Sequence, residues 1–445
     1  MININSWECG KGKTTKWINK IIIGSDRVLL VVPSIELQHQ YAKTFPNIRF
    51  INNQNSTSVV KEAYELLNNN NKFVCITSQA FIRMHLDYTI KSRYTLIIDE
   101  AFDPIRKFSI DSTKAYNLPD FKFRDKLTIT GNLDWVFNEL TSNDRLTYTD
   151  WSNISVDNSY AGSIMEESKT WRMLTDMNYK TYMRISEYEK LCINAKDKCI
   201  VIQMLNECIL TDWNIVYIAS AKFESTFMYF WIKQTGIKYN ISKTLQFTPH
   251  DSPITLHAPP KLKWSKTRNL KDPNVLDQYH NYVNSIADSN VLSIRNNNEL
   301  RTLTNDVNVN HNVHGMNNKS HITNVSLESA LNPDSQLYSF YKTFLEMDQN
   351  KYDTEIKDAF CAHLFYQVIM RTAIRNNESI NVFLLDTDIA CVLTSYFFNI
   401  SVREIEIVTA NSNKPGRPKL SKQQIKDNKR EYMKQYMRCK RNVSF

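Results

Sequence analysis

A short loop rich in glycine and lysine near the start of the chain constrains the fold more than any other feature. It reads Cys9-Gly-Lys-Gly-Lys-Thr-Thr15 and lies between the apolar stretch Ile2–Ile4 and a segment that can form a helix. Glycines in such a loop let backbone N–H groups surround a phosphate, and the next helix directs its positive end toward the anion. The loop therefore predicts an ATP site, formed by Gly10, Lys11, Gly12, Lys13, Thr14 and Thr15.

Two residues of this loop have distinct expected roles. Lys13 is expected to reach the β- and γ-phosphates, and the hydroxyl of Thr14 is expected to bind Mg²⁺. The alternative is an ordinary lysine-rich surface turn, and the position of the loop at the end of a strand argues against it.

A pair of carboxylates supplies the second half of the expected site. The sequence Leu96-Ile-Ile-Asp-Glu-Ala101 is an apolar run that ends in two acids, and Asp99 follows Lys13 by 86 residues. We expect Asp99 to bind Mg²⁺ and Glu100 to orient or deprotonate the attacking water. A solvated acidic turn is the alternative for this motif taken alone.

Strand-like segments recur through most of the chain. Continuous aliphatic runs such as Val28–Val32 are typical of strands buried on both faces of a parallel sheet, and their alternation with polar helical segments predicts an α/β fold with a doubly wound sheet. The expected strands are Ile2–Ile4, Val28–Val32, Phe73–Thr77, Thr95–Ile98, Ile215–Ile218, Val291–Ile294, Asn324–Ser329 and Ile380–Leu385.

Several further segments, taken in order, resemble the motifs of superfamily 2 (DEAD-like) helicases. Val31–Gln40 resembles motif Ia, Ile76–Gln79 motif Ib and Ile218–Lys222 motif III. Val291–Asn296 resembles motif IV, His314–Asn317 motif V and Gln367–Arg375 motif VI. The resemblance implies that Pro33, Ser34, Thr77 and Ser220 contact nucleic acid. It departs from the family at Lys222, where the family usually has Thr.

The last of these motifs contains two arginines. The resemblance implies that Gln367, Arg371 and Arg375 act on the γ-phosphate from a second domain. Arginines four residues apart on a helix share one face, which can present both guanidinium groups across a cleft. Met370 replaces the usual Gly, and the second arginine comes one residue later than in the family. The sequence therefore leaves open which of the two is the arginine finger that contacts the γ-phosphate, and Arg375 is favoured.

The resemblance implies two RecA-like P-loop domains with parallel sheets. The first spans residues 1–245 and includes a mainly helical insertion at about 102–213. The second spans residues 246–410, and residues 411–445 form a basic tail. The polar stretch with Pro249, Pro253, Pro259 and Pro260 is expected to be an inter-domain connection. A looser likeness is to viral replication-origin-binding helicases.

The basic tail carries the whole charge excess of the chain. The segment Lys414–Arg441 has eleven basic and two acidic residues, which equals the net charge of +9, so the tail is expected to bind a polyanion. Lys414-Pro-Gly-Arg-Pro-Lys419 resembles an AT-hook, which implies that Arg417 and Lys419 contact the DNA minor groove. A solubilising tail or a localisation signal is the alternative.

Composition narrows the setting in which the protein works. The sequence has no apolar run long enough for a membrane span and no signal-peptide core, so we expect an intracellular location: the cytoplasm, the nucleus or a viral replication site. The eight cysteines form no CxxC pair, so neither zinc nor disulfides are expected. The abundance of Asn is typical of an AT-rich genome and hints at a virus, phage or plasmid.

These features together predict an ATP-dependent helicase or translocase that uses ATP and Mg²⁺. We expect it to act on nucleic acid, with DNA favoured over RNA, in replication of a virus or mobile element and in company with replication proteins. Two alternatives stay open: a terminase-like packaging ATPase, and a replication initiator with a non-catalytic ATP fold. The sequence leaves the oligomeric state open.

Overall fold

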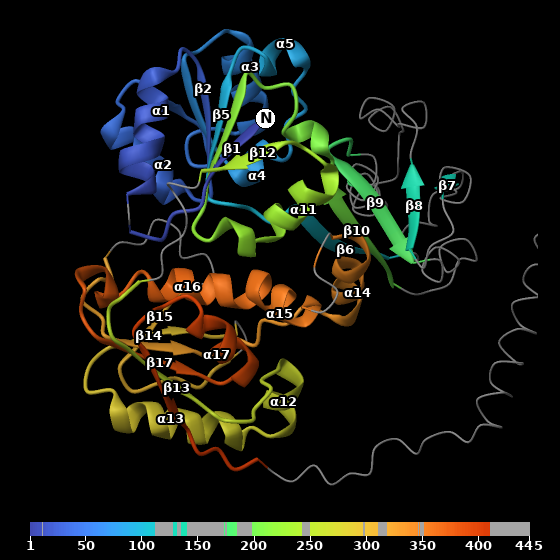
Figure 1. The fold of residues 1–445 in the computed structure, drawn as a ribbon. Helices are drawn as coiled ribbons and strands as arrows, with labels where there is room; N and C mark the ends of the chain where they lie inside the picture. Colours follow the sequence, from blue (N-terminus) through green and yellow to red (C-terminus); the bar gives the residue numbers. More distant parts are fainter. Residues whose placement is uncertain are drawn as a thin grey trace, which may run out of the picture.

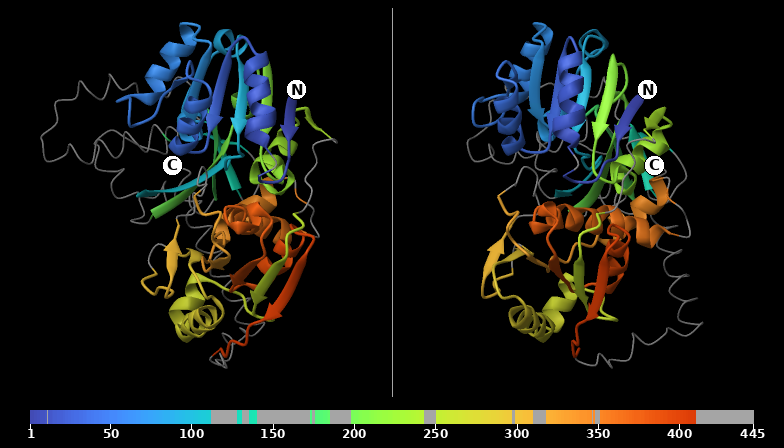
Figure 2. Two further views of the ribbon diagram at one scale, coloured as in Figure 1. Left: turned by 90° about the vertical axis from the view of Figure 1, so that its left-hand side faces the viewer. Right: turned by 60° about the vertical axis from the view of Figure 1, so that its left-hand side comes forward.

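The computed structural model shows two α/β bodies joined along one side, with an antiparallel sheet extending from the first body (Figures 1 and 2). It describes residues 1–10, 12–111, 128–130, 135–139, 173, 176–184, 198–242, 250–296, 299–309, 318–345, 347 and 351–409. The basic tail, with Arg417 and Lys419, lies outside the described residues, and so does the expected motif V at His314–Asn317.

The first body is built on a parallel sheet of seven strands in the order β12-β1-β11-β5-β2-β4-β3. Every residue of β2 and β5 is buried, which is why these strands are continuous aliphatic runs. The strands are β1 (Ile2–Asn5), β2 (Val28–Val32), β3 (Arg49–Phe50), β4 (Phe73–Thr77), β5 (Thr95–Asp99), β11 (Ile215–Ala219) and β12 (Tyr239–Ile241).

Helices cover both faces of this sheet (Figure 1). Several begin at a side-chain cap, as in α2, where the hydroxyl of Ser34 accepts a hydrogen bond from the backbone N–H of Leu37. The helical elements of this body are η1 (Lys13–Ile18), α1 (Asn19–Gly24), α2 (Ile35–Thr44), α3 (Val59–Asn68), α4 (Ser78–Phe81), α5 (Tyr88–Lys91), η4 (Glu207–Ile209), η5 (Phe223–Ser225) and α11 (Phe227–Thr235).

The described part of the insertion is a five-stranded antiparallel sheet, so the expectation of a mainly helical insertion is wrong for these residues. The strand order is β6-β10-β9-β8-β7. The partners Ile202 and Tyr182 lie opposite each other on β10 and β9, and both belong to the core of the first body. Cross-strand pairs of aromatic and β-branched residues stabilise such a sheet. The strands are β6 (Ile105–Asp111), β7 (Thr128–Thr130), β8 (Trp135–Glu139), β9 (Tyr179–Arg184) and β10 (Lys198–Leu205).

The second body is a six-stranded parallel sheet in the order β15-β14-β16-β17-β13-β18. Its strands are β13 (Ile254–Ala258), β14 (Val291–Ile294), β15 (Asp306–Asn308), β16 (Asn324–Leu327), β17 (Ile380–Leu384) and β18 (Ile400–Glu404). Its helical elements are α12 (Lys266–Lys271), α13 (Asn274–Ile286), α14 (Ser335–Phe344), α15 (Tyr352–Lys357), η7 (Asp358–Ala362), α16 (His363–Ile369), η8 (Ala373–Asn376) and α17 (Thr387–Thr394).

The strand β13 corrects a second expectation. The sequence around it was interpreted as a polar connection because prolines surround it, yet β13 pairs with β17 on one side and β18 on the other. Pro253 and Pro259 lie just outside the strand, where the missing N–H does not interrupt the ladder. None of the helices among the described residues combines the length and apolar composition that a bilayer crossing requires.

One helix of the second body packs on the first. Phe340 and Tyr341 of α14 are part of the first hydrophobic core, where Tyr341 stacks on Phe227 with ring centroids 4.3 Å apart. Phe340 meets Tyr182 of the insertion sheet edge-on at 5.2 Å. This segment therefore connects the second body, the first body and the insertion sheet.

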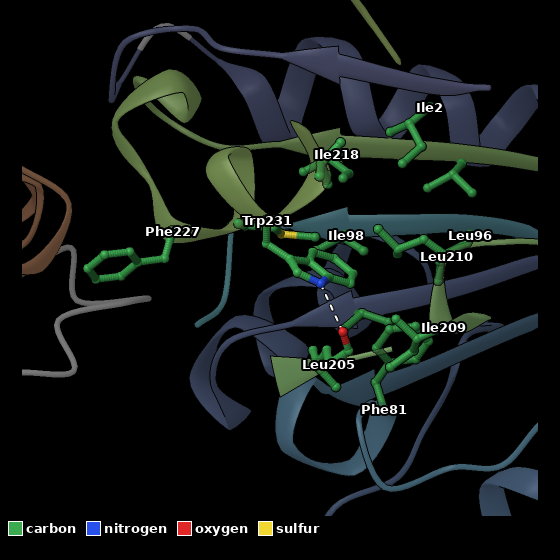
Figure 3. Packing of buried hydrophobic residues seen from close by; sticks show 14 of the residues in the cluster. Ile2, Phe81, Leu96, Ile98, Leu205, Ile209, Leu210, Ile218, Phe227 and Trp231 are labelled. Atoms are coloured by element: carbon green, nitrogen blue, oxygen red, sulfur yellow. Dashed lines mark hydrogen bonds between the residues drawn. The ribbon is translucent and has the colours of Figure 1, made fainter. Parts of the chain in front are cut away.

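The indole of Trp231 ties α11 to the insertion sheet inside the same core. Its side chain is fully buried, and its ring N–H donates to the backbone carbonyl of Leu205 at 2.9 Å (Figure 3). A buried indole N–H needs such a partner, because leaving it unpaired costs free energy.

Trp231→Phe should lower the free energy of unfolding by about 1–3 kcal/mol, because it leaves the Leu205 carbonyl without this donor and opens a space in the core. Urea unfolding followed by circular dichroism measures the change. Trp17→Phe is the matched control, since Trp17 is only partly buried. Equal stability of the Trp231→Phe protein and the wild type would contradict this account.

Candidate functional site

The carboxyl ends of three neighbouring strands bring the expected ATP residues to one edge of the first sheet. Strands β1, β11 and β5 are adjacent and parallel, and their register aligns Asn5, Ala219 and Asp99 in one row. The loop after β1, the turn after β11 and the residue after β5 therefore meet at the same place. The phosphate loop and the two acids, far apart in the sequence, become neighbours in this way.

The backbone of the loop has the form that the sequence predicts. Gly10 and Gly12 have φ angles of +82° and +86°, which residues with side chains rarely adopt. The ammonium of Lys13 lies across the loop and donates to the carbonyl oxygen of Trp7 at 3.1 Å. Lys11 lies outside the described residues, and Thr15 is placed only as backbone in η1, the helical turn that follows the loop.

Asp99 is buried and accepts two hydrogen bonds on one oxygen. The hydroxyl of Tyr41 donates to its Oδ2 at 2.7 Å, and that of Thr14 donates to the same atom at 3.3 Å. Burial raises the pKa of Asp99 from 3.8 to about 6, against the lowering effect of the Tyr41 hydrogen bond. Thr14 and Asp99 thus meet as predicted. Tyr41 was not predicted, because a tyrosine inside α2 carries no sequence signal for this contact.

Glu100 has an unusual backbone conformation that its neighbours fix. Its φ angle is +94°, and its N–H donates to the carbonyl of Ala219 at 2.7 Å. The hydroxyl of Ser220 donates to its carboxylate. Ser220, expected from the resemblance to contact nucleic acid, is fully buried and supports Glu100 instead in this arrangement.

The expected arginines come from the second body but do not share one helix face, which corrects the sequence prediction. Helix α16 ends at Ile369, and Arg375 belongs to η8, which begins after Thr372. Thr372 is extended, and its hydroxyl donates to the carbonyl of Ile369 at 2.6 Å. The backbone N–H of Ala373 donates to Ile322 instead of continuing the helix. Gln367, on α16, is buried.

Charged groups of both bodies affect the pKa of the Cys9 thiol in the phosphate loop. Burial raises the pKa of the Cys9 thiol, and the charges of Lys13, Arg371 and Arg375 oppose that rise. The negative charge of the Glu100 carboxylate also raises the pKa of this thiol. Arg371 and Arg375 belong to the second body, so charges of both bodies affect the pKa of this thiol.

Direct contacts also join the two bodies here. The hydroxyl of Tyr366 on α16 accepts a hydrogen bond from the backbone N–H of Cys9 at 3.0 Å. His363 contacts the carbonyl of Ala221 through Nε2 at 2.7 Å. Helix α16 lies on the side of the second body that faces the first (Figure 1). The sequence analysis assigns no role to Tyr366, although this residue directly precedes Gln367, the first residue of the expected motif VI.

A separate groove of about 390 Å³ lies along the same edge of the first sheet, at the ends of β2 and β4. It is lined by Pro33, Ser34 and Thr77, which are three of the expected nucleic-acid contacts, and also by Arg83. The hydroxyls of Ser34 and Thr77 cap α2 and α4, so both residues occupy helix starts at this groove. Helix starts of this kind favour anions.

The donor set fits a magnesium nucleotide. Mg²⁺ is usually held by one or two carboxylates together with phosphate oxygens and waters, and Thr14 with Asp99 supplies that partial set. Within the described ranges, no group of three His, Cys, Asp or Glu side chains is arranged to bind a metal alone. The positive φ angles of Gly10 and Gly12 give the loop the curvature that surrounds a phosphate.

Comparison with solved structures identifies the fold. The chain is similar to an XPD structure in the apo form and to an XPD helicase structure, with TM-scores of 0.51 and 0.50. Each is 13% identical, and each alignment covers 91% of this chain and 97% or 96% of the solved one. No protein-family model and no curated protein sequence matches the chain. The likeness confirms the expected helicase-like fold of two RecA-like domains and says nothing of source or substrate.

Asp99→Asn should make the Mg²⁺-free protein more stable at pH 7 by on the order of 2–3 kcal/mol. The folded-state pKa is raised from 3.8 to about 6, so the folded state holds the proton more tightly than the unfolded state. The wild type therefore loses stability as pH rises from about 4 to about 6, whereas the Asn variant does not.

Urea unfolding of both proteins at pH 4 and pH 7 measures this difference. The advantage of the variant should fall below about 1 kcal/mol at pH 4, where the carboxyl is protonated in the folded state and about half protonated in the unfolded state. Asp251→Asn is the control, because the side chain of Asp251 is 85% exposed. A variant that is less stable than the wild type at pH 7 would show that charged Asp99 stabilises the fold.

Proposed function

We propose that this chain is an ATP-hydrolysing motor of the superfamily 2 type that moves on nucleic acid. One observation carries the proposal: the backbone N–H of Cys9 in the phosphate loop donates to the hydroxyl of Tyr366 at 3.0 Å, and the segment with Tyr366 continues into Arg371 and Arg375. A site shared between two bodies is completed only when they come together, which couples hydrolysis to relative movement. The helicase-like fold supports the same function.

Each residue has a role that follows from its place. The backbone of the loop and the ammonium of Lys13 hold the β- and γ-phosphates. Thr14 and Asp99 hold Mg²⁺, which when bound neutralises charge on the transferred phosphoryl group. Glu100, fixed by Ser220, orients the attacking water.

The arginines supply positive charge from the other side of the cleft. Burial lowers the pKa of Arg375, and the like charge of Arg371 adds to the effect. An arginine that is partly desolvated stabilises negative charge more strongly than one in water, because the local dielectric constant is lower. Arg375 acts as the finger in this proposal, with Arg371 beside it.

Nucleic acid follows the groove at the ends of β2 and β4, where Pro33, Ser34 and Thr77 contact the phosphate backbone and Arg83 adds a charge. The basic tail, with Arg417 and Lys419, adds affinity for DNA through its charge of +9. In this proposal DNA is the substrate, and replication of a virus or mobile element is the setting.

Removing the machinery for hydrolysis tests the motor. Glu100→Gln should retain nucleotide binding and slow turnover by several decades, on the order of 10³ or more, because the amide cannot orient and deprotonate water as a carboxylate does. Lys13→Ala should weaken nucleotide binding as well. ATPase is measured with and without DNA, beside Glu65→Gln, whose side chain is 58% exposed. Wild-type protein that binds DNA without hydrolysing ATP would favour a non-catalytic initiator.

Arg375→Ala should lower kcat by on the order of 10³, in line with the loss of an arginine finger, with little change in nucleotide affinity. Arg371→Ala should cost less. Arg403→Ala is the control, since Arg403 is exposed on the edge strand β18. Turnover near the wild-type rate in both variants, Arg371→Ala and Arg375→Ala, would contradict a shared site.

A further inference from the structure

Lys222 extends from the first body into the second at the position where the resembling family has Thr. Its ammonium lies 3.2 Å from the centroid of the Tyr396 ring, 3.9 Å from Oδ2 of Asp358 and 3.4 Å from Oγ of Ser395. All three partners belong to the second body, in η7 and in the turn after α17. A threonine side chain is too short to make these contacts.

Lys222 combines an unusual backbone conformation with a side chain that is mostly buried. Its φ and ψ angles are 47° and 53°, the left-handed region that residues with a side chain rarely adopt. Its side chain is only 18% exposed, and burying an ammonium is costly without compensation. The aromatic face and the carboxylate supply that compensation.

The ring of Tyr396, which Lys222 contacts, is connected to the phosphate loop through Tyr366. Tyr396 packs on Tyr366 with ring centroids 4.9 Å apart, and the hydroxyl of Tyr366 accepts the N–H of Cys9. The hydroxyl of Tyr396 donates to Asp358, which fixes the ring in place. Two adjacent tyrosines of the second body therefore hold two separate loops of the first, one at Cys9 and one at Lys222.

The two loops, at Cys9 and at Lys222, contain or support residues of the expected ATP site. The phosphate loop contains Lys13, and the loop with Lys222 begins at Ser220, which supports Glu100. The same segment that contains Tyr366 continues into Arg371 and Arg375. We propose that Lys222, Tyr396 and Tyr366 form an interdomain clamp that holds the two bodies in the arrangement in which the arginines face the phosphate loop.

The predicted effect of the clamp on turnover rests on the proposed function. Its predicted effect on the arrangement of the two bodies does not. Lys222 is a positioning residue in this proposal, because it acts through its contacts with the second body. Its loss should lower kcat more than it changes KM, since the phosphate-binding groups of the first body stay in place. The arginines would then be in position for a smaller fraction of the time.

The shape of the protein tests the clamp without any nucleotide. Spin labels on unnatural amino acids at the exposed positions Lys20 and Lys271 report the distance between the bodies by pulsed electron resonance and leave the native cysteines in place. Lys222→Met should broaden the distance distribution, and Lys222→Arg should keep it narrow because arginine retains the charge and stacks on tyrosine. Lys233→Met is the matched control: Lys233 lies over the Tyr229 ring within the first body.

The rate of ATP turnover provides a second test of the clamp. Lys222→Met should lower kcat by on the order of tenfold, the scale of a desolvated cation–π contact, and Lys222→Arg should restore most of it. Tyr396→Phe keeps the ring and should cost less than Lys222→Met, and the double variant should cost less than the sum of the two. Phe keeps the buried ring of Tyr396 in place, whereas truncation to Ala would open a cavity in the core, so the Phe variant is the informative one.

The outcomes separate the clamp from the proposed function. A broadened distance in Lys222→Met with no ATPase in the wild type would support the clamp and overturn the motor. An unchanged distance and an unchanged kcat in Lys222→Met would overturn the clamp and leave the motor standing. Equal losses in Lys222→Met and Lys222→Arg would also overturn it, because they would show that only packing at this position matters.

Discussion

The parallel pairing of β1, β11 and β5 is the constraint on which the rest of the structure depends. It aligns Asn5, Ala219 and Asp99, so the chain leaves all three strands on the same edge of the sheet. Parallel neighbours must be joined by long crossovers, and here one crossover contains the whole insertion between β5 and β11. The insertion can therefore have its own antiparallel sheet without disturbing the spacing between the phosphate loop and the two acids.

Much of the first sheet could be predicted because its strands are buried on both faces. Such a strand appears in the sequence as an uninterrupted aliphatic run, as in Val28–Val32, which has the predicted bounds. Phe73–Thr77 in the same sheet and Val291–Ile294 in the second sheet also have the predicted bounds. The loop at Gly10 and Gly12 was also predictable, because positive φ angles require glycine. Thr14 and Asp99 meet as expected because Asp99 ends β5 and Thr14 follows β1 at the same edge of the sheet.

The failed predictions share a physical origin in contacts distant in sequence. Strand β13 lies between two prolines, and only its pairing with β17 and β18 makes it a strand. The end of α16 depends on Ala373 bonding to Ile322, which no local pattern encodes. The contacts of Tyr41 and Tyr366 likewise arise only when separate elements come together.

The docking of α14 changes what counts as a domain in this molecule. In sequence the helix lies between β16 and β17 of the second body, yet Tyr341 packs against Phe227 in the core of the first. The chain thus crosses between the bodies more than once. Cutting the protein at its sequence boundary would expose an aromatic surface on each half, so the halves would be prone to aggregate and would be poor stand-ins for the intact chain.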